Sequence, residues 1–508
     1  MKINILEYFL ETVKKHPEKI AVKQGEENIS FRELQKRSVA LSYTIVKSID
    51  TINQPIAVFL PKSIDAVVAN TAITYSGNIY MNLDVKAPNE RIGNILNLVQ
   101  PVVMITNQQY FNIIKNVLPD TVKVFFIDDE YPMDVQQEDY LRNRIAQLID
   151  TDPYCIINTS GSTGTPKAVV LNHKSFFDFT EWSIDTLKIG DEEIIGSLSP
   201  IVFDIYSHEL CMMMSKGSTI VLLPEHLSAF PIKILEILKK ENVSYLFWVP
   251  TIMVNIANMN LLSNIDLPAL KTVWFAGEVL PTKQYNYWHK HLPHTKFVNL
   301  YGPIEITLDC TYYIVNREFE DWEPLPIGFP CRNTSVLILN DKNQLCRQGE
   351  EGELCVRGTS LAMGYYNNSE KTLAAFTQNP LNTKYPEIIY RTGDVVMENE
   401  RGEIMFKGRR DTLVKHLGYR IELGEIEHVV VNTLKLVPNG CVIYQQQNQE
   451  IALVYESDIE ILAADFRKQI GKYLPKYMIP TKYIRVDKMP MNTNGKIDRL
   501  KLNQEING

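Results

Sequence analysis

A run of nine residues, TSGSTGTPK at 159–167, has the composition of a loop that binds phosphate. Glycines let the backbone approach an anion closely, hydroxyls and N–H groups donate to phosphate oxygens, and the lysine adds positive charge. The run follows the apolar stretch YCIIN and precedes LNHKSFFDF, which can start a helix. It is not a Walker loop, because GxxxxGK[ST] cannot be matched. A Ser/Gly linker is the alternative, but a linker seldom lies between a buried strand and a helix. The candidate phosphate ligands are Thr159, Ser160, Gly161, Ser162, Thr163, Gly164 and Lys167.

The elements that must position this loop form an α/β fold. Short β-branched runs at 56–60, 102–106, 122–128, 154–159, 244–250, 272–278 and 296–302 alternate with helical stretches and predict parallel strands with crossover helices. Ligands of such sheets bind beyond the carboxyl ends of the strands. After about Glu323, alternating runs with Gly turns predict a small antiparallel β lobe, and a small α+β tail follows.

These patterns predict two domains. A large N-terminal domain, residues 1–410, would hold parallel-type sheets, helices and the β lobe, and a small mobile α+β C-terminal domain would span 411–508. The charged, Gly-led stretch GRRD at 408–411 suits a hinge, which we place at Asp411.

Composition excludes several classes of protein. Hydrophobic residues make up 45% and charged residues 22% of the 508 residues, and the formal charge is -8, so wholesale disorder is not expected. No Lys/Arg block is long enough to follow a nucleic acid or an anionic membrane. The seven cysteines are scattered without a CxxC pair, so neither a disulfide framework nor a zinc site is indicated. The first 19 residues read as an amphipathic helix, not a signal peptide, and no run approaches a membrane span; we therefore expect a cytoplasmic protein without membrane insertion.

A series of further motifs makes the sequence resemble a known superfamily. In order they are ISFREL at 29–34, YMNLD at 80–84, FDIYSHEL at 203–210, FAGEVLP at 275–281, NLYGPIE at 299–305, GELCVRG at 352–358, YRTGD at 390–394, GRRDTLVKHLGYRIELGEIE at 408–427 and NGKIDR at 494–499. With the loop at 159–167 they resemble the adenylate-forming superfamily, which includes acyl-CoA synthetases, luciferases and peptide-synthetase adenylation domains. Chain length, FAGEVLP and YMIP are most similar to D-alanine:carrier-protein ligases and stand-alone adenylation domains.

The resemblance implies that ATP activates a carboxylic acid as an acyl-adenylate. A carboxylate oxygen attacks the α-phosphorus and pyrophosphate leaves, so no general base is needed. The site must instead align two anions and neutralise charge in the transition state, which requires cations, N–H donors and a metal. ATP and Mg²⁺ are thus the expected cofactors.

Similarity to the family assigns roles around the nucleotide. Asp394 of YRTGD would accept hydrogen bonds from the ribose hydroxyls, and Arg409 of GRRD would contact ribose or phosphate. In NLYGPIE, Tyr301 would stack on adenine, Asn299 would read its amino group, Gly302 would complete the turn and Glu305 would hold Mg²⁺. Without the resemblance these would read as a turn Asp, a surface Arg, core residues and a helix N-terminal charge.

The resemblance also assigns a lysine near the end of the chain. Lys496 of NGKIDR would lie between the substrate carboxylate and the α-phosphate, although alone it reads as a hairpin residue. In the family, rotation about the hinge removes this lysine and presents the loop 415–419, with Gly418, to an incoming thiol.

Substrate recognition is read from the segment FDIYSHEL. Asp204 occupies the position at which amino-acid-activating members pair a carboxylate with the α-ammonium, which favours an amino acid over a fatty or aryl acid. The family pattern places the remaining lining at His208, Phe247, Trp274, Ala276, Leu300, Leu308 and Asp309. The bulky Phe247 and Trp274 predict a small substrate side chain, whereas His208 and Asp309 could reach a hydroxyl or amine.

Several residues depart from the family pattern. Ala276 replaces the cysteine of D-alanine ligases, and Ile304 replaces the threonine of YGPTE, with Thr307 as a candidate substitute for the lost hydroxyl. Leu413 and Leu417 replace polar residues, which makes thiol transfer less certain than adenylation.

We therefore expect activation of D-alanine or another amino acid, followed by transfer to the phosphopantetheine thiol of a separate carrier protein, with coenzyme A as the second choice. The alternatives are an acyl-CoA ligase for a non-amino acid, a non-catalytic nucleotide-binding relative, and a structural protein.

Overall fold

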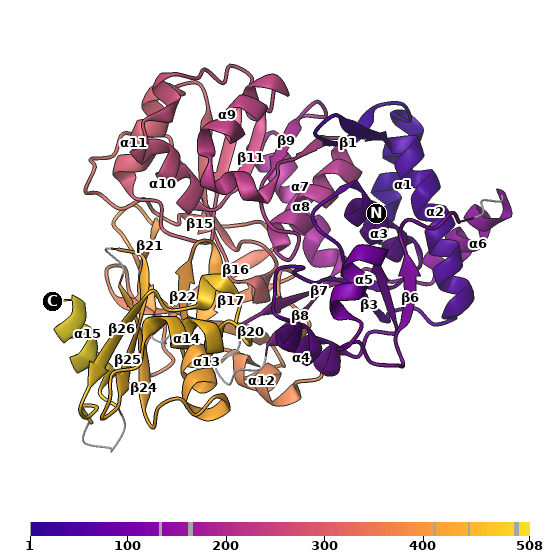
Figure 1. Ribbon diagram of the computed structural model, residues 1–508. Coiled ribbons are helices and arrows are strands. Elements are labelled where there is room, and N and C mark those ends of the chain that lie inside the picture. Colours follow the sequence, from indigo (N-terminus) through magenta and orange to yellow (C-terminus); the bar gives the residue numbers. More distant parts are fainter. Residues whose placement is uncertain are drawn as a thin grey trace.

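The computed structural model describes residues 2–131, 135–160, 166–409, 413–445, 448–491 and 497–507. These residues form a large N-terminal part with two sheets, a β lobe and a small C-terminal unit, and the C-terminal unit lies against the other two (Figure 1). The predicted α/β fold, with a large N-terminal and a small C-terminal domain, is confirmed.

The first sheet has nine strands, and six consecutive ones are parallel. Its strand order is β15 (Phe329–Pro330), β14 (Thr311–Ile314), β13 (Lys296–Tyr301), β12 (Thr272–Phe275), β11 (Tyr245–Trp248), β9 (Ile194–Ser197), β10 (Thr219–Leu222), β1 (Ile20–Gln24) and β2 (Glu27–Ser30). The carboxyl ends of β11, β12 and β13 lead into the segments that carry Val249, Ala276 and Gly302.

The second sheet has seven strands, and five consecutive ones are parallel. Its order is β18 (Gly364–Tyr365), β8 (Lys167–Asn172), β7 (Pro153–Thr159), β4 (Ile79–Asn82), β3 (Pro55–Phe59), β5 (Val103–Thr106) and β6 (Lys123–Phe126).

One expectation about this sheet is wrong. The predicted phosphate loop does not connect a strand to a helix: it joins β7 to β8, which are antiparallel, with Thr159 opposite Lys167. The buried run AVVL makes β8 a strand, and the helix starts only afterwards at His173, where Asn172 accepts a hydrogen bond from the N–H of Ser175.

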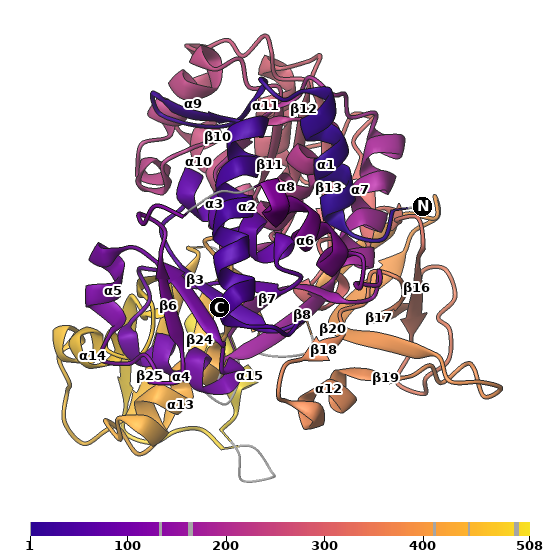
Figure 2. The same ribbon diagram turned by 90° about the vertical axis from the view of Figure 1, so that its right-hand side faces the viewer.

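Two buried helices lie between the sheets. Helix α3 (Ile64–Tyr75) is buried along almost its whole length, as is α8 (Asp204–Lys216), and their side chains join those of both sheets in one core. Figure 2 shows α3 and α8 in this layer. The remaining helices of the N-terminal part and lobe are α1 (Ile5–Lys15), α2 (Phe31–Ser48), α4 (Asn89–Val99), α5 (Gln108–Ile114), α6 (Val135–Ile145), α7 (His173–Leu187), α9 (Pro231–Lys240), α10 (Pro250–Asn258), α11 (Thr282–His291) and α12 (Ser369–Ala375).

The β lobe is antiparallel, as predicted. It contains β16 (Thr334–Leu339), β17 (Glu351–Gly358), β20 (Ile388–Glu398), β19 (Phe376–Gln378) and β21 (Ile404–Arg409), which pairs with β20. That pairing sets Asp394 directly opposite Arg409. Asp394 and Arg409 belong to different sequence motifs, but they are neighbours on adjacent strands.

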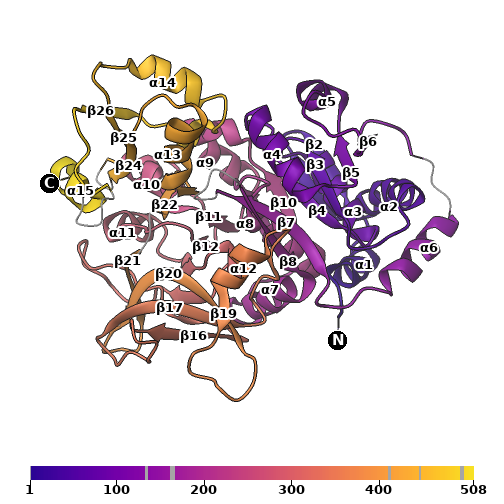
Figure 3. The ribbon, with the colours of Figure 1, turned by 90° about the horizontal axis from the view of Figure 1, so that it is seen from below.

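The C-terminal unit has its own core, built from residues after 420. It contains the hairpin β22 (Leu413–His416) and β23 (Tyr419–Glu422), the sheet of β24 (Gly440–Gln445), β25 (Glu450–Glu456) and β26 (Lys482–Val486), and helices α13 (Leu423–His428), α14 (Ala463–Ile470) and α15 (Arg499–Asn507). Figure 3 shows this unit (yellow) and the β lobe (orange) on one side of the molecule and the sheet around β3 (purple) on the other. Within the described ranges, no helix combines the length and hydropathy needed to cross a bilayer.

Candidate active site

A cavity of about 160 Å³ lies where the N-terminal sheets, the β lobe and the C-terminal unit meet. Its walls come from strand ends and loops of all three parts. The residues that line it and that the sequence singled out include Thr159, Ser160, Asp204, Phe247, Ala276, Gly302, Ile304, Leu308, Asp309, Asp394 and Arg409. The motifs are thus brought together from segments up to 250 residues apart, as ligand binding at strand ends requires.

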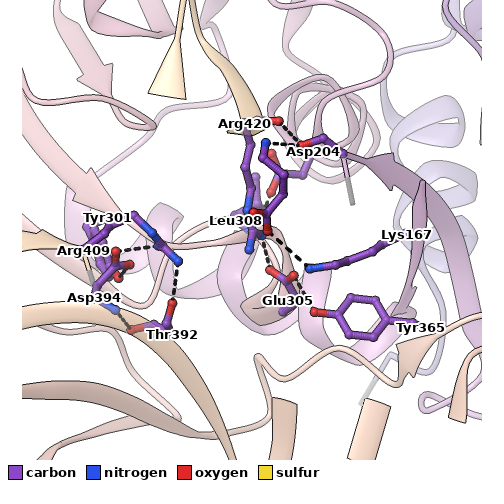
Figure 4. A network of polar contacts seen from close by, with 12 residues as sticks. Lys167, Asp204, Tyr301, Glu305, Leu308, Tyr365, Thr392, Asp394, Arg409 and Arg420 are labelled. Carbon is purple, nitrogen blue, oxygen red and sulfur yellow. Dashed lines mark hydrogen bonds and ion pairs between the residues drawn. The ribbon is translucent and has the colours of Figure 1, made fainter. Parts of the chain in front are cut away.

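Asp394 and Arg409 form an ion pair in the β-lobe wall of the cavity. Arg409 Nη1 lies 2.5 Å from Asp394 Oδ1, and its Nη2 donates to the carbonyl of Thr392 at 3.0 Å. The hydroxyl of Tyr301 donates to the other oxygen of Asp394 (Figure 4). A carboxylate fixed by two donors is held ready for further polar contacts at the cavity surface, and the guanidinium keeps positive charge there.

Two residues expected at the adenine lie behind the cavity wall. Tyr301 and Asn299 are buried and do not line the cavity, and the side-chain amide of Asn299 donates to the carbonyl of Pro326 at 2.7 Å. Gly302, the next residue, does line it, and a side chain there would be excluded because a Cβ atom would lie 2.3 Å from the carbonyl oxygen of Leu308.

Glu305, the expected Mg²⁺ ligand, is fully buried and pairs with a residue of the C-terminal unit. Its carboxylate contacts the guanidinium of Arg420 and accepts a hydrogen bond from Tyr365 Oη at 2.8 Å (Figure 4). Burial opposes the charge, but Arg420 and Tyr365 outweigh it and hold the pKa of the Glu305 carboxyl below its usual range.

Both oxygens of Glu305 have partners and the residue does not line the cavity, so a metal could reach this carboxylate only after Arg420 moves away. Among the described residues no group of three or more His, Cys, Asp or Glu side chains could hold a metal unaided. Mg²⁺ commonly takes one or two protein carboxylates and completes its octahedron with phosphate and water oxygens. Arg420 supplies the positive charge at Glu305 in the present arrangement.

The C-terminal unit also contacts both ends of the predicted phosphate loop. Ser160 Oγ donates to the carbonyl of Arg420 at 2.6 Å and accepts from the N–H of Glu422 at 3.0 Å. Lys167 Nζ lies 3.6 Å from Glu422 Oε1. The middle of this loop, with Gly161, Ser162, Thr163 and Gly164, lies outside the described residues, as do Lys496 and Asp411.

Asp204 is the first residue of α8 and lines the cavity. Its Oδ2 accepts a hydrogen bond from the N–H of Leu308 at 3.2 Å. Burial raises the pKa of this carboxyl to about 6, although the N–H groups of Leu308, Ile205 and Asp204 itself act in the opposite direction. The positive end of the helix favours the carboxylate, so Asp204 is placed to meet a cation.

The remaining predicted lining residues lie at two depths. Phe247, Ala276, Leu308 and Asp309 line the cavity, whereas His208, Trp274 and Leu300 do not. His208 stacks on Trp274 with ring centroids 5.6 Å apart, and Phe247 contacts Trp274 edge-on at 5.5 Å. All three are fully buried, so this aromatic cluster fills the space behind the cavity.

The turn between β22 and β23 closes the cavity from the C-terminal side. Lys415, Gly418, Tyr419 and Arg420 line it, and the N–H of Gly418 donates to Glu278 Oε1 at 2.6 Å. Gly418 has φ of 83°, and a Cβ atom there would lie 3.1 Å from Val249. The backbone conformation favours glycine, and any side chain would require Val249 to shift slightly.

Several site residues were missed by sequence reasoning. Arg420 and Glu425 stand in the quoted motif GYRIELGEIE, but their partners, Glu305 and Arg91, could not be read from it. Tyr477, stacked on Tyr419 with centroids 3.6 Å apart, also lines the cavity; it is the first residue of the quoted motif YMIP, but the motif assigned it no role. A buried arginine or glutamate needs a partner of opposite charge. The charged residues of this motif therefore signalled that partners exist, but not which residues they are.

The fold, with its large N-terminal part and small C-terminal unit, is shared with solved adenylation domains. The adenylation domain AlmE of Vibrio cholerae, solved in complex with glycyl-adenosine-5'-phosphate, superimposes with a TM-score of 0.84 at 20% identity, over 100% of this chain and 98% of that one. A family model described as AMP-binding enzyme matches residues 9–366. The chain therefore belongs to the AMP-binding enzyme family, and the resemblance to the adenylate-forming superfamily is confirmed.

Curated relatives cover nearly all of this chain. Zwittermicin A synthase ZmaJ of Bacillus cereus is 29% identical over 507 residues, which are 98% of this chain and 94% of that protein. Tyrocidine synthase 2 of Brevibacillus parabrevis is 30% identical over 505 residues, but this chain spans only 13% of its length. The similarity thus covers nearly the whole length of ZmaJ but only a small part of tyrocidine synthase 2.

Proposed function

We propose that this protein activates an amino acid with ATP and transfers the aminoacyl group to the phosphopantetheine thiol of a separate carrier protein. In the first step a carboxylate oxygen of the amino acid attacks the α-phosphorus and pyrophosphate leaves. In the second step the thiol sulfur attacks the acyl carbon, AMP leaves and the thiol proton passes to solvent. The observation that carries the proposal is the cavity that Asp204 shares with Asp394 and Arg409.

The nucleotide end of the cavity suits an adenylate. Asp394 is oriented by Arg409 and Tyr301, so its carboxylate is pre-positioned to accept hydrogen bonds from ribose hydroxyls. Thr159 and Ser160 at the start of the phosphate loop line the same cavity, and Lys167 lies opposite Thr159 on the neighbouring strand. When bound, Mg²⁺ on Glu305 would supply positive charge at the phosphates.

The substrate end suits an α-amino acid. Asp204 is a partly buried carboxyl that accepts a hydrogen bond from Leu308 and has no cationic partner within ion-pair distance in the described part of the chain, so an α-ammonium group would complete its contacts. A fatty or aryl acid would leave it without this cation, at a cost in affinity. D-alanine is one candidate, and its enantiomer and other amino acids are the competitors.

The position of the C-terminal unit supports thiol transfer. The turn that carries Gly418 already lies at the cavity, and Ile92 and Ile95 of α4 line the same cavity as Tyr477 of the C-terminal unit. A slender phosphopantetheine arm would enter between these residues. Coenzyme A carries the same arm and is the alternative thiol. We propose that rotation about Asp411 exchanges this turn for Lys496 during adenylation.

Amino-acid-dependent exchange of pyrophosphate into ATP tests the proposal. The assay should cover the twenty amino acids, both alanine enantiomers, and fatty and aryl acids. We expect exchange with an amino acid. In Asp204→Ala, the kcat/KM for that amino acid should fall about ten- to a hundred-fold, because the charge-assisted hydrogen bond to its ammonium group is lost. Asp266→Ala, which removes an exposed carboxyl, serves as the control. Exchange supported only by a fatty acid would refute the amino-acid assignment.

The exchange reaction should depend on pH through Asp204. Its pKa of about 6 means that below this pH the carboxyl is protonated and must lose a proton before it can pair with an ammonium. At saturating ATP, the KM for the amino acid should rise about tenfold per pH unit below pH 6. Initial rates between pH 5 and 8 measure this, and Asp204→Asn should flatten the profile. A KM that stays constant over this range in the wild-type enzyme would contradict the assignment.

A further inference from the structure

A second carboxyl group faces the cavity beside Asp204. Asp309 lines the cavity and is 2% exposed. In the described part of the chain its carboxyl makes neither a hydrogen bond nor an ion pair. Burial and the neighbouring Asp204 raise the pKa of Asp309 well above its usual range, and Lys415 offsets this only in part. A buried carboxyl without a partner is costly, so a ligand that satisfies it would gain affinity.

Lys415 is not the partner of Asp309. Its ammonium lies 5.9 Å from the centre of the Tyr301 ring, and no carboxylate of the described residues is within ion-pair distance of it. Lys415 also belongs to strand β22 of the C-terminal unit, whereas Asp204 and Asp309 belong to the N-terminal part. The pair of carboxyl groups is therefore a property of the substrate wall itself.

The backbone before Asp309 is held in an unusual conformation. Thr307 and Leu308 have φ angles of 44° and 65°, in the left-handed region that such residues rarely adopt. The hydrogen bond from Leu308 to Asp204 and the close fit of Gly302 under the Leu308 carbonyl support this conformation. Uncommon backbone conformations that neighbours enforce occur preferentially at ligand sites.

The aromatic cluster behind the cavity limits the length of the substrate. Phe247 lines the cavity, and Trp274 and His208, both fully buried, pack behind it. An amino acid whose ammonium is at Asp204 and whose carboxylate faces the nucleotide has little space beyond a short side chain. That side chain would end near Asp309.

On these grounds, and resting on the proposed function, we infer that the preferred amino acid has a short side chain ending in a hydrogen-bond donor, a hydroxyl or an amine, and that Asp309 accepts this bond. An apolar side chain of the same size would leave the carboxyl unsatisfied. Sites built to hydrogen-bond a substrate reject analogues that lack the donor far more strongly than apolar pockets reject a missing methylene.

Matched pairs of amino acids test the inference in the exchange assay. Serine against alanine, and 2,3-diaminopropionate against 2-aminobutyrate, differ almost only in the donor. We expect at least a tenfold higher kcat/KM for the donor-bearing member of one pair, in one enantiomer. Asp309→Ala should reduce that ratio at least tenfold, and Asp309→Asn should reduce it less, because its amide oxygen still accepts a hydrogen bond. A wild-type preference for alanine or 2-aminobutyrate, or a ratio unchanged in Asp309→Ala, would overturn the inference.

A binding experiment on the unmodified protein makes the test independent of how the variants fold. Calorimetry should show that the seryl or 2,3-diaminopropionyl sulfamoyl-adenosine binds at least tenfold more tightly than its alanyl or 2-aminobutyryl counterpart, and equal or reversed affinities overturn the inference. Exchange with apolar amino acids alone would overturn it while leaving the proposed function intact. Exchange with no amino acid would overturn both.

Discussion

Replacing Lys496 with alanine should slow adenylate formation by roughly 10²–10³, because loss of a preorganised charge at the reacting groups costs about 2.7–4 kcal/mol. Both reactants are anions, and an ammonium between them stabilises the transition state more than either reactant. Pyrophosphate exchange measures this step directly.

Two comparisons make this experiment specific. Lys501→Ala removes an exposed lysine from α15 of the same unit and should have little effect. In Lys496→Ala, transfer from a chemically prepared aminoacyl-adenylate should be impaired less than exchange, because we propose that the thiol step takes place with Gly418 at the cavity. Undiminished exchange in this variant would contradict the catalytic role of Lys496.

Gly418→Val should reduce thiol transfer roughly 10²-fold, because the β22–β23 turn would have to move away from Val249 and displacements of about 1 Å can cost this much. The φ of 83° at this position adds strain for any side chain. Single-turnover transfer of preformed adenylate to a phosphopantetheinylated carrier measures the effect.

The control for this variant is Gly418→Ala, whose smaller side chain should cause a smaller loss. Exchange should fall less than transfer in both variants, because adenylation is expected with the turn moved away from the cavity. Equal losses of exchange and transfer would indicate general disruption and would contradict a specific role for the turn.

Much of the fold could be predicted because its signals are local. The apolar runs that became β3, β5, β7, β11, β12 and β13 carry the composition of buried parallel strands. The division of these strands into two sheets could not be predicted, because strand partners depend on contacts between distant segments. The strand β8 was missed for a different, local reason: its apolar run follows a Gly-rich loop, and the nearby helix start at His173 reads as the next element.

At the site, motifs located the polar residues but not their depth or their partners. Asp394 and Arg409 were assigned to one ligand, and the structure makes them neighbours through strand register. The position of Trp274 and His208 behind Phe247 depends on how the rings pack, which spacing does not encode. The pairing of Glu305 with Arg420 depends on how the C-terminal unit sits against the rest of the chain.

The central claim is that groups from both ends of the polypeptide bring an amino acid and ATP together for reaction. The most direct test is a single turnover with [α-³²P]ATP, Mg²⁺ and excess enzyme, in which labelled products are separated after acid quenching. Labelled aminoacyl-adenylate should appear only when a suitable amino acid is present, and its formation should slow in Asp204→Ala and Lys496→Ala. Binding of ATP without labelled adenylate, for every amino acid offered, would contradict the account.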